Sequence, residues 1–302
     1  MAPRHVTVFG GSGFVGRAIV ERLAADGALV RIAVRHPERA ALPEPAGRIS
    51  ALPADVWDEA SLPPALEGAD AVVNTVGHYV ERGAASFDAI HGAGARNVAA
   101  AAKAAGVRRL VHISGIGADP ASPSAYVRAR AAGERLVSEA FAAATILRPS
   151  VMFGPEDAFF NRLAALARVL PVLPLFGNGA VRLQPVYVED TALAVARALV
   201  DPAARGRTYE LGGPRIYSYA DLVRLALEHS GRRRLLLPVP YRAWDAIASL
   251  AARLPSPPIS RDQVTLMRHD NVVSPGMPGF LDLGIVPRAP EAILPTYLRR
   301  AG

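Results

Sequence analysis

Short apolar runs alternate with alanine-rich stretches of helical periodicity through the first half of the chain. The apolar runs span residues 6–9, 29–34, 49–52, 71–76, 110–114 and 144–150. The helical patterns lie between them, at residues 14–26, 59–68, 86–106 and 125–141. Strands and helices that alternate at this spacing predict a doubly wound parallel sheet with helices on both faces, which is an α/β fold of the Rossmann type.

The pattern changes after Pro149, where proline becomes frequent and the alternation loosens. Residues 185–200 again resemble a strand followed by a helix, and they are candidates for the sheet of the first half. We therefore expect a nucleotide-binding domain made of residues 1–150 and about 181–204. A smaller, discontinuous C-terminal α/β domain is expected from about 151–180 and 205–302, closing over the ligand cleft.

A glycine-rich turn separates the first predicted strand from the first predicted helix, with glycines at positions 10, 13 and 16. Glycines at this spacing permit a tight turn, close approach of the backbone to a pyrophosphate and packing of the helix on the strand. The N–H groups at the start of the helix then face the phosphates. We predict that the cofactor contacts Gly10, Ser12, Gly13, Phe14, Val15 and Gly16.

Arg35 follows the second predicted strand, where a protein that binds NAD(H) usually carries an acid for the ribose 2′-hydroxyl. A guanidinium instead suits a 2′-phosphate, through charge-assisted and often bidentate hydrogen bonds. We therefore predict NADP(H) rather than NAD(H) as the cofactor. The alternative is an arginine that is simply solvated at the end of its strand.

Two further segments end strands at the same predicted edge of the sheet, which is where ligands of open α/β folds bind. In each segment the alternative is ordinary turn chemistry. The segments contribute Asp55 and Val56 after the third strand, and Asn74, Thr75, Val76 and Gly77 at the end of the fourth.

Several motifs together resemble the extended short-chain dehydrogenase/reductase superfamily, which includes the NAD-dependent epimerases and dehydratases. They are GGSGFVG (10–16), HISGIGAD (112–119), SPSAYVRARAAGE (122–134), ILRPSVMFGPED (146–157) and QPVYVEDTA (184–192). With YELGGP (209–214) and SRDQVTLMRHDNVVS (260–274), the chain is most similar to the family of the complex I alpha-subcomplex subunit 9 and its bacterial relatives. This resemblance covers nearly the whole chain. It implies a Rossmann-type domain, a small C-terminal domain, bound NADP(H), and a link to respiratory complex I or ubiquinone metabolism.

The resemblance also implies where catalysis would occur. Active short-chain dehydrogenases use a Tyr-x-x-x-Lys pair on one helix face, in which the lysine lowers the tyrosine pKa and holds the nicotinamide ribose. The matching residues here are Tyr126 and Arg130, and Arg130 is bulkier and planar. The superfamily's catalytic hydroxyl falls at Gly115, with Ser114 beside it as the candidate. Tyr126 is therefore a catalytic acid, a cofactor contact or a packed aromatic residue.

Composition narrows the chemistry. The chain has no cysteine, which excludes disulfides, thiolate metal sites, cysteine nucleophiles and dithiol redox chemistry. Its single lysine, Lys103, lies in the helical pattern before the fifth strand, so no tyrosine–lysine pair at helical spacing exists in the chain. None of the histidines has metal-ligand spacing, so we expect no catalytic metal.

The net charge of +7 raises the question of an anionic partner. Arginines are scattered, and the densest run, Arg232–Arg234, is not interleaved with the aromatic residues that base stacking needs. We therefore expect no nucleic acid. An anionic cofactor, lipid head groups or an acidic partner protein, such as one of a respiratory complex or a quinone pathway, fits better.

An apolar stripe at helical spacing follows the arginine run. It is either core packing of the small domain or an amphipathic surface for a membrane interface or a quinone-like tail, with the arginines facing anionic lipid. No run is long and apolar enough to span a membrane, so we expect a cytoplasmic protein, with peripheral contact at the inner face of the cell membrane as an open alternative. The stripe contains Tyr241, Trp244, Ile247, Ala248, Ala251 and Leu254.

Two functions remain from the sequence. The first is an accessory protein of complex I or quinone metabolism, in which NADP(H) stabilises the folded state. The second is an NADP-dependent oxidoreductase or epimerase/dehydratase-type enzyme that acts on a carbonyl or quinone-related substrate. In the second, Tyr126 donates the proton and Arg130 replaces the lysine.

Overall fold

The computed structural model describes residues 2–40, 46–78, 81, 86–254 and 259–298. The chain divides into two compact units, the first made of residues 1–149, 188–211 and 275–285, and the second of residues 150–187, 212–274 and 286–302. These units differ from the predicted domain boundaries at Ser150, which belongs to the second unit, and in three longer segments. Residues 181–187 belong to the second unit, whereas residues 205–211 and 275–285 belong to the first.

The first unit is built on a seven-stranded sheet in the order β11-β6-β5-β4-β1-β2-β3, and every neighbouring pair is parallel. This confirms the predicted doubly wound Rossmann-type fold. The seventh strand, β11, was not predicted, because its four residues were assigned to the small domain. The strands are β1 (His5–Phe9), β2 (Leu29–Val34), β3 (Ile49–Pro53), β4 (Ala71–Asn74), β5 (Arg109–Ile113), β6 (Thr145–Pro149) and β11 (Thr208–Leu211).

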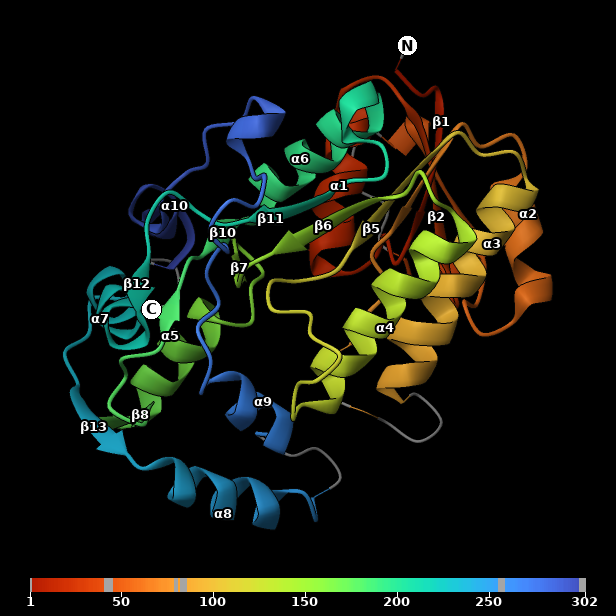
Figure 1. The fold of residues 1–302 in the computed structure, drawn as a ribbon. Helices are drawn as coiled ribbons and strands as arrows, with labels where there is room; N and C mark the ends of the chain where they lie inside the picture. The colour runs from red at the N-terminus through yellow and green to blue at the C-terminus, as the bar shows by residue number, and fades with distance from the viewer. Residues whose placement is uncertain (1, 41–45, 79–80, 82–85, 255–258, 299–302) are drawn as a thin grey trace. The chain divides into compact units, whose positions relative to one another are not determined.

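Helices cover both faces of this sheet (Figure 1). On one face α1 (Phe14–Ala25) packs against α6 (Val188–Val200), and on the other lie α2 (Leu62–Leu66), α3 (Ala95–Ala104) and α4 (Ala125–Ala140). The predicted helix over 86–106 contains a π-helix, η4 (Asp88–Gly94), directly before α3. The short 3₁₀ helices are η1 (Pro37–Arg39), η2 (Ala46–Arg48), η3 (Glu59–Ser61), η5 (Pro202–Ala204) and η6 (Leu281–Leu283).

Apolar side chains fill the space between the sheet and the helices α2, α3 and α4. Leu62, Leu66, Val98 and Leu110 are each at most 2% exposed there. Burial of a leucine side chain contributes about 1.5–3 kcal/mol, so this layer is a main source of the unit's stability. None of the helices within the described residues is both long and apolar enough to cross a membrane.

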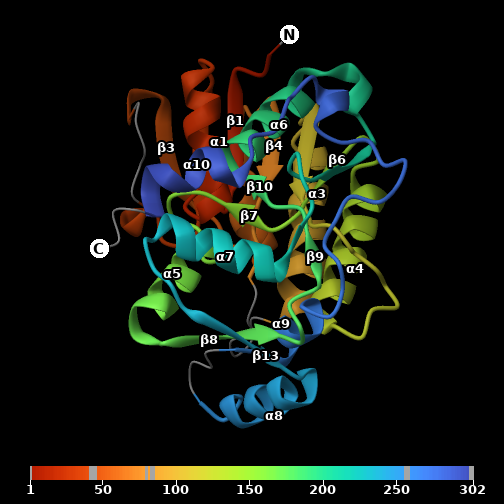
Figure 2. The same ribbon diagram turned by 90° about the vertical axis from the view of Figure 1, so that its left-hand side faces the viewer.

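The second unit contains three two-stranded sheets and five α-helices, counted over the described residues (Figure 2). The predicted strand over 185–187 lies here as β10, which pairs with β7 and not with the large sheet. The strands are β7 (Met152–Phe153), β8 (Val172–Phe176), β9 (Arg182–Leu183), β10 (Val186–Tyr187), β12 (Tyr217–Ser218) and β13 (Leu235–Val239). The helices are α5 (Phe160–Val169), α7 (Tyr219–His229), α8 (Tyr241–Ala251), α9 (Arg261–Leu266) and α10 (Pro290–Tyr297).

A buried carboxylate joins the C-terminal helix of this unit to α5. Asp157 accepts hydrogen bonds from the backbone N–H groups of Phe160 and Asn161 at the start of α5, at 2.6 and 3.2 Å. The Tyr297 hydroxyl at the end of α10 donates to the same carboxylate at 2.6 Å. The pKa of Tyr297 is raised by burial and by the Asp157 charge, so the phenol stays protonated and the bond persists across the neutral range.

The contact between α4 and η4 yields a stability prediction. A Cβ on Gly133 would overlap the His91 carbonyl oxygen and lie 3.0 Å from its carbonyl carbon, which are backbone atoms. We expect Gly133→Ala to lower the free energy of unfolding by about 1–3 kcal/mol, measured by urea denaturation, because the two helices must move apart. Gly92→Ala is the matched control, since its nearest neighbour would be Leu136 Cδ1 at 4.0 Å. Equal losses in the two variants would contradict the close-packing argument.

Candidate functional site

The glycine-rich turn follows β1 at the point where the strand order reverses, between β1 and β4. Gly10 has a φ of 77°, and its carbonyl accepts a hydrogen bond from the Gly13 N–H at 3.0 Å. A Cβ on Gly16 would overlap the Gly10 carbonyl group and lie 2.8 Å from the Gly11 Cα. The turn therefore needs glycine at both ends, as its predicted role in cofactor binding requires.

The helix that follows the turn offers free donors. Gly13 is the N-cap of α1 and has no side chain, so no side-chain hydrogen bond caps this end of the helix. The first backbone N–H groups of a helix have no partner within the helix, and the helix dipole makes this end positive. Ser12 is exposed beside them, and Phe14 and Val15 are half-buried in the first turn. These residues fit a pyrophosphate group.

The end of β4 packs directly on the turn. A Cβ on Gly10 would lie 2.7 Å from Thr75 Oγ1 and 3.1 Å from the Val76 nitrogen. The Thr75 hydroxyl donates to the Phe9 carbonyl at 2.8 Å, and Asn74 Oδ1 accepts from the Val76 N–H at 3.1 Å. The structure thus brings the predicted β4 residues together with the glycine turn, while Asn74 performs the turn chemistry that was its alternative.

The end of β2 carries the predicted 2′-phosphate group. Arg35 is exposed, and within the described residues it has no hydrogen-bond or ion-pair partner. Its neighbours differ, because His36 Nδ1 lies 3.4 Å and Arg39 Nε 3.7 Å from the Glu38 carboxylate. Arg35 is therefore the cation at this strand end that is available to a ligand.

The segment after β3 is organised as a turn. Asp55 Oδ1 accepts a hydrogen bond from the Trp57 N–H at 3.0 Å. Val56 is 5% exposed, and its carbonyl accepts a hydrogen bond from Asn97 Nδ2 on α3 at 3.1 Å. Turn chemistry is thus present at Asp55, and contact of Asp55 and Val56 with adenine stays a prediction.

The candidate catalytic pair lies at the start of α4. Ser124 caps this helix by accepting a hydrogen bond from the Val127 N–H, and the four-residue spacing places Tyr126 and Arg130 on one face. Arg130 Nη1 donates a hydrogen bond to the Tyr126 hydroxyl oxygen at 2.6 Å. Tyr126 is 5% exposed. A positive charge thus bonds the phenol directly.

Sequence reasoning missed the groups that surround Tyr126. Tyr126 makes T-shaped contacts with the rings of Phe87 and His91, whose centroids lie 5.4 and 5.3 Å from that of Tyr126. Burial lowers the pKa of His91 to about 3, and the Arg130 charge acts in the same direction. Burial likewise lowers the pKa of His112, on β5, to about 4. Both imidazoles are therefore neutral at pH 7.

The Ser114 hydroxyl takes part in a buried ion-pair network. It donates to the carboxylate of Glu134 on α4, and Glu134 Oε2 lies 2.6 Å from Arg148 Nη2 on β6. A second carboxylate, Glu210 on β11, lies 3.3 Å from Arg148 Nη1. Glu134 and Glu210 are 7% and 3% exposed. The network joins α4, β5, β6 and β11, so in this structure Ser114 has a structural partner.

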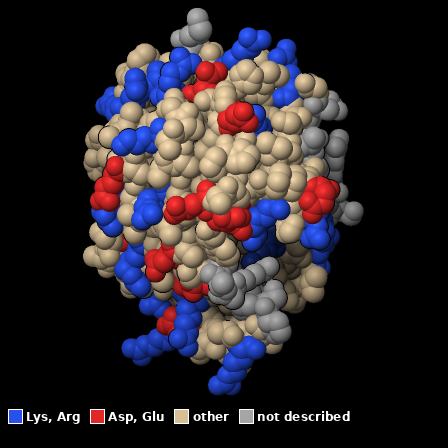
Figure 3. Space-filling view, turned by 90° about the vertical axis from the view of Figure 1, so that its right-hand side faces the viewer, with Lys and Arg blue, Asp and Glu red and all other residues tan. Residues whose placement is uncertain are grey.

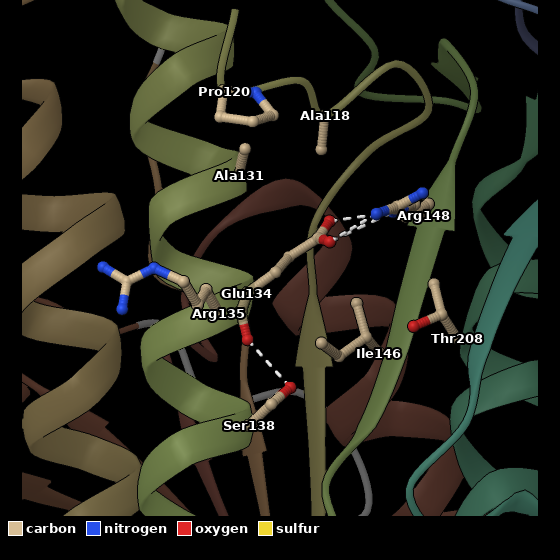
Figure 4. Close-up of a pocket in the computed structure, with 9 residues that line it drawn as sticks. All are labelled: Ala118, Pro120, Ala131, Glu134, Arg135, Ser138, Ile146, Arg148 and Thr208. Carbon is tan, nitrogen blue, oxygen red and sulfur yellow. Dashed lines mark hydrogen bonds and ion pairs between the residues drawn. The ribbon is translucent and has the colours of Figure 1, made fainter.

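A surface pocket of about 300 Å³ lies beside this network. Figure 4 shows the forked contact of Arg148 with Glu134 in its wall, between α4 and β6. The remaining lining residues are Ala118, Pro120, Ala131, Arg135, Ser138, Ile146 and Thr208. Glu134 and Arg148 bind each other, and Arg135 Nη1 lies 2.6 Å from the Glu139 carboxylate, so the pocket adds no unpaired charged group. Within the described residues, no cluster of three or more His, Cys, Asp or Glu side chains could hold a metal ion.

Comparisons with known proteins identify the kind of domain. A family described as NAD(P)H-binding matches residues 10–158, which include the glycine turn, Arg35 and Tyr126. The NADH dehydrogenase [ubiquinone] 1 alpha subcomplex subunit 9 of Arabidopsis thaliana is 34% identical, over 93% of this chain and 74% of its own length. The mouse protein of the same name is 33% identical, over 97% and 79%. The ceramide reductase of Caulobacter vibrioides is 30% identical, over 78% and 73%.

Solved structures show the same fold. A nucleoside-diphosphate-sugar epimerase from Staphylococcus aureus aligns with a TM-score of 0.75 at 19% identity, over 98% of this chain and 99% of its own. An NADPH-dependent quinone oxidoreductase from Escherichia coli, solved with NADPH, aligns with a TM-score of 0.74 at 21% identity, over 98% and 99%. These alignments show the same Rossmann-type fold.

Proposed function

Because this chain belongs to the family of the NADH dehydrogenase alpha subcomplex subunit 9 proteins, we propose that it is an NADP(H)-binding accessory protein of respiratory complex I or ubiquinone metabolism. In this role the nucleotide stabilises the folded protein, because a ligand that binds only the native state shifts the folding equilibrium toward it. The similarity to named subunits spans residues of both compact units, which supports a role for the whole chain rather than for the nucleotide domain alone.

A single observation supports the choice of NADP(H). Arg35 is the exposed, partner-free cation at the end of β2, within the described residues, and no acid occupies its position. The first turn of α1 would hold the pyrophosphate, and Arg35 would hold the 2′-phosphate. A bound nicotinamide would supply hydride chemistry at the Tyr126 end of the sheet. NAD(H) lacks the 2′-phosphate and would leave the guanidinium of Arg35 without that partner.

We expect NADPH to bind at least about tenfold more tightly than NADH. Arg35→Gln should lower the affinity for NADPH about 10- to 100-fold and change the affinity for NADH little. The reason is the loss of a charge-assisted bond to the 2′-phosphate alone. Isothermal titration calorimetry at constant salt measures both affinities. Arg22→Gln removes the same charge from the exposed face of α1, where Arg22 pairs with Asp26, and serves as the control. Equal losses for NADPH and NADH in Arg35→Gln would refute the assignment.

The second candidate is an NADP-dependent oxidoreductase, and the hydrogen bond from Arg130 to the Tyr126 hydroxyl favours it. A guanidinium that donates to a phenol oxygen stabilises the phenolate, which a proton-transfer residue needs. Two similar proteins carry reductase names, the ceramide reductase of Caulobacter vibrioides and the 2-alkyl-3-oxoalkanoate reductase of Stenotrophomonas maltophilia. The Ser114 hydroxyl bonded to Glu134 supports the accessory role instead.

Substitution of Tyr126 by phenylalanine separates the two roles. For an accessory protein, we expect nucleotide to copurify without turnover and Tyr126→Phe to leave respiratory function intact. For an enzyme, NADPH oxidation with decylubiquinone should fall at least about 100-fold in Tyr126→Phe, because a general acid contributes that much or more. NADPH absorbance reports turnover, and Tyr209→Phe on β11 is the control. Protein without bound nucleotide and without a thermal shift on NADPH addition would refute both roles.

A peripheral membrane contact is the third element of the proposal, and it is supported by α8. The predicted apolar stripe divides into two rows. Ala248 and Ala251 are buried, and Trp244 stacks on Phe176 with ring centroids 4.4 Å apart. Ile247 and Leu254 of the stripe are solvent-exposed, at 45% and 54%. They form an exposed row at helical spacing with Leu250, which the prediction did not include and which is 66% exposed.

Positive charge accompanies this exposed row. The run Arg232–Arg234 precedes β13, and Arg242 and Arg253 are exposed on and just after α8. On the face shown in Figure 3, Lys and Arg side chains are spread among acidic and uncharged residues, so charge alone marks no binding surface there. The combination of an exposed apolar row with nearby arginines is what fits an anionic lipid surface.

We expect the protein to cosediment with phosphatidylcholine vesicles that contain phosphatidylglycerol, less so at high salt, and Leu250→Ser with Ile247→Ser to weaken that binding at least about tenfold. The loss follows from the removal of two apolar side chains from the lipid contact. Leu281→Ser is the matched control, since Leu281 is 75% exposed in the first unit. Binding that is unchanged in the double variant, or absent in the wild-type protein, would rule out this surface.

A further inference from the structure

The Arg130 side chain lies against Gly115, where a side chain at position 115 would otherwise extend. A Cβ on Gly115 would lie 2.7 Å from Cζ and 2.8 Å from Nη2 of Arg130. The backbone of Gly115 is not in the left-handed region, so its conformation does not call for glycine. The three nearest atoms that a Cβ there would meet all belong to the Arg130 guanidinium. The guanidinium thus occupies the volume next to the end of β5 in which a side chain at 115 would otherwise lie.

The charge of Arg130 has no counter-ion among the described residues. Its hydrogen bond goes to the Tyr126 hydroxyl, and its Nε is buried without a partner. Arg148 shows the contrasting case, because it is also partly buried and is held by the carboxylates of Glu134 and Glu210. A half-buried guanidinium without an acid loses hydration that nothing in the protein replaces.

The groups around Arg130 do not compensate its charge. His91 packs edge-on against Tyr126, and His112 lies on β5 in the buried layer. Burial lowers the pKa of both histidines, to about 3 and about 4, and repulsion by the Arg130 charge acts in the same direction. The region therefore carries one net positive charge at pH 7. An anion that bonded the free N–H groups of Arg130 would neutralise it.

We propose that Arg130, admitted by Gly115, is an anion-binding group that takes a carboxylate or phosphate oxygen beside the Tyr126 hydroxyl. The anion belongs either to a second ligand with a carboxylate or to the pyrophosphate of the dinucleotide, which Arg130 would then share with the first turn of α1. This inference goes beyond the proposed function, because it concerns a group that neither the accessory role nor the choice of NADP(H) requires.

Benzoate and benzamide are suitable probes, since they have equal size and differ in charge. We expect benzoate, and not benzamide, to bind the wild-type protein in calorimetric titrations run with and without saturating NADP⁺. Arg130→Gln should abolish benzoate binding. Gly115→Ala keeps the charge of Arg130 and displaces its guanidinium, so it should weaken the affinity for benzoate at least about tenfold. Gly47→Ala is the control, because nothing lies within 4 Å of its Cβ position, and it should change neither affinity.

The two nucleotide conditions separate the sources of the anion. Benzoate binding in the presence of NADP⁺ assigns the anion to a second ligand. Benzoate binding only without NADP⁺, with nucleotide affinity lowered in Arg130→Gln and in Gly115→Ala, assigns it to a phosphate of the cofactor. Equal binding of benzoate and benzamide, benzoate binding unchanged in Arg130→Gln, or no benzoate binding in either condition overturns the proposal. Benzoate binding in a protein that binds no NADP⁺ would refute the proposed function alone.

Discussion

Close packing at glycines along the carboxyl edge of the sheet is the constraint on which the arrangement of the first unit depends. A Cβ would collide with neighbouring atoms at four glycines of this edge. Gly10 follows β1, Gly16 lies in the first turn of α1, Gly77 follows β4 and Gly115 follows β5. Each collision marks a place where backbone or a functional side chain approaches more closely than an ordinary residue allows. The edge can therefore bring the glycine turn, the end of β4 and the start of α4 together.

Charge at this edge is handled in two different ways. Arg148 lies between the sheet and α4, where it forms ion pairs with Glu134 on α4 and Glu210 on β11. Its charge therefore links α4 to β6 and β11. Arg35 and Arg130 have no acidic partner among the described residues, and they lie at the ends of strands or beside them. The same residue type thus stabilises the fold when it is paired and remains available to a ligand when it is not.

The sequence predicted the first six strands because each contains an apolar run, although β3, at the edge of the sheet, is only partly buried. It predicted the glycine turn because the spacing of its glycines is local. β11 escaped notice because it is four residues long and contains Glu210, a charged residue that a buried strand rarely carries. Glu210 is paired there with Arg148, 62 positions away in the chain. The neighbours of Tyr126 were missed for the same reason, since His91 reaches it through the packing of a π-helix against α4. Long-range pairs of this kind leave no local pattern.

Arginine at position 130 by itself says little about function. A chain with one lysine places arginine at most of its cationic positions, whatever those positions do. A guanidinium is larger than an ammonium group, however, and a change of residue type does not create the space that it needs. Gly115 supplies that space, and it does so at a position whose backbone any residue could adopt. The matched volumes at 115 and 130, rather than the arginine alone, distinguish a built site from a consequence of composition.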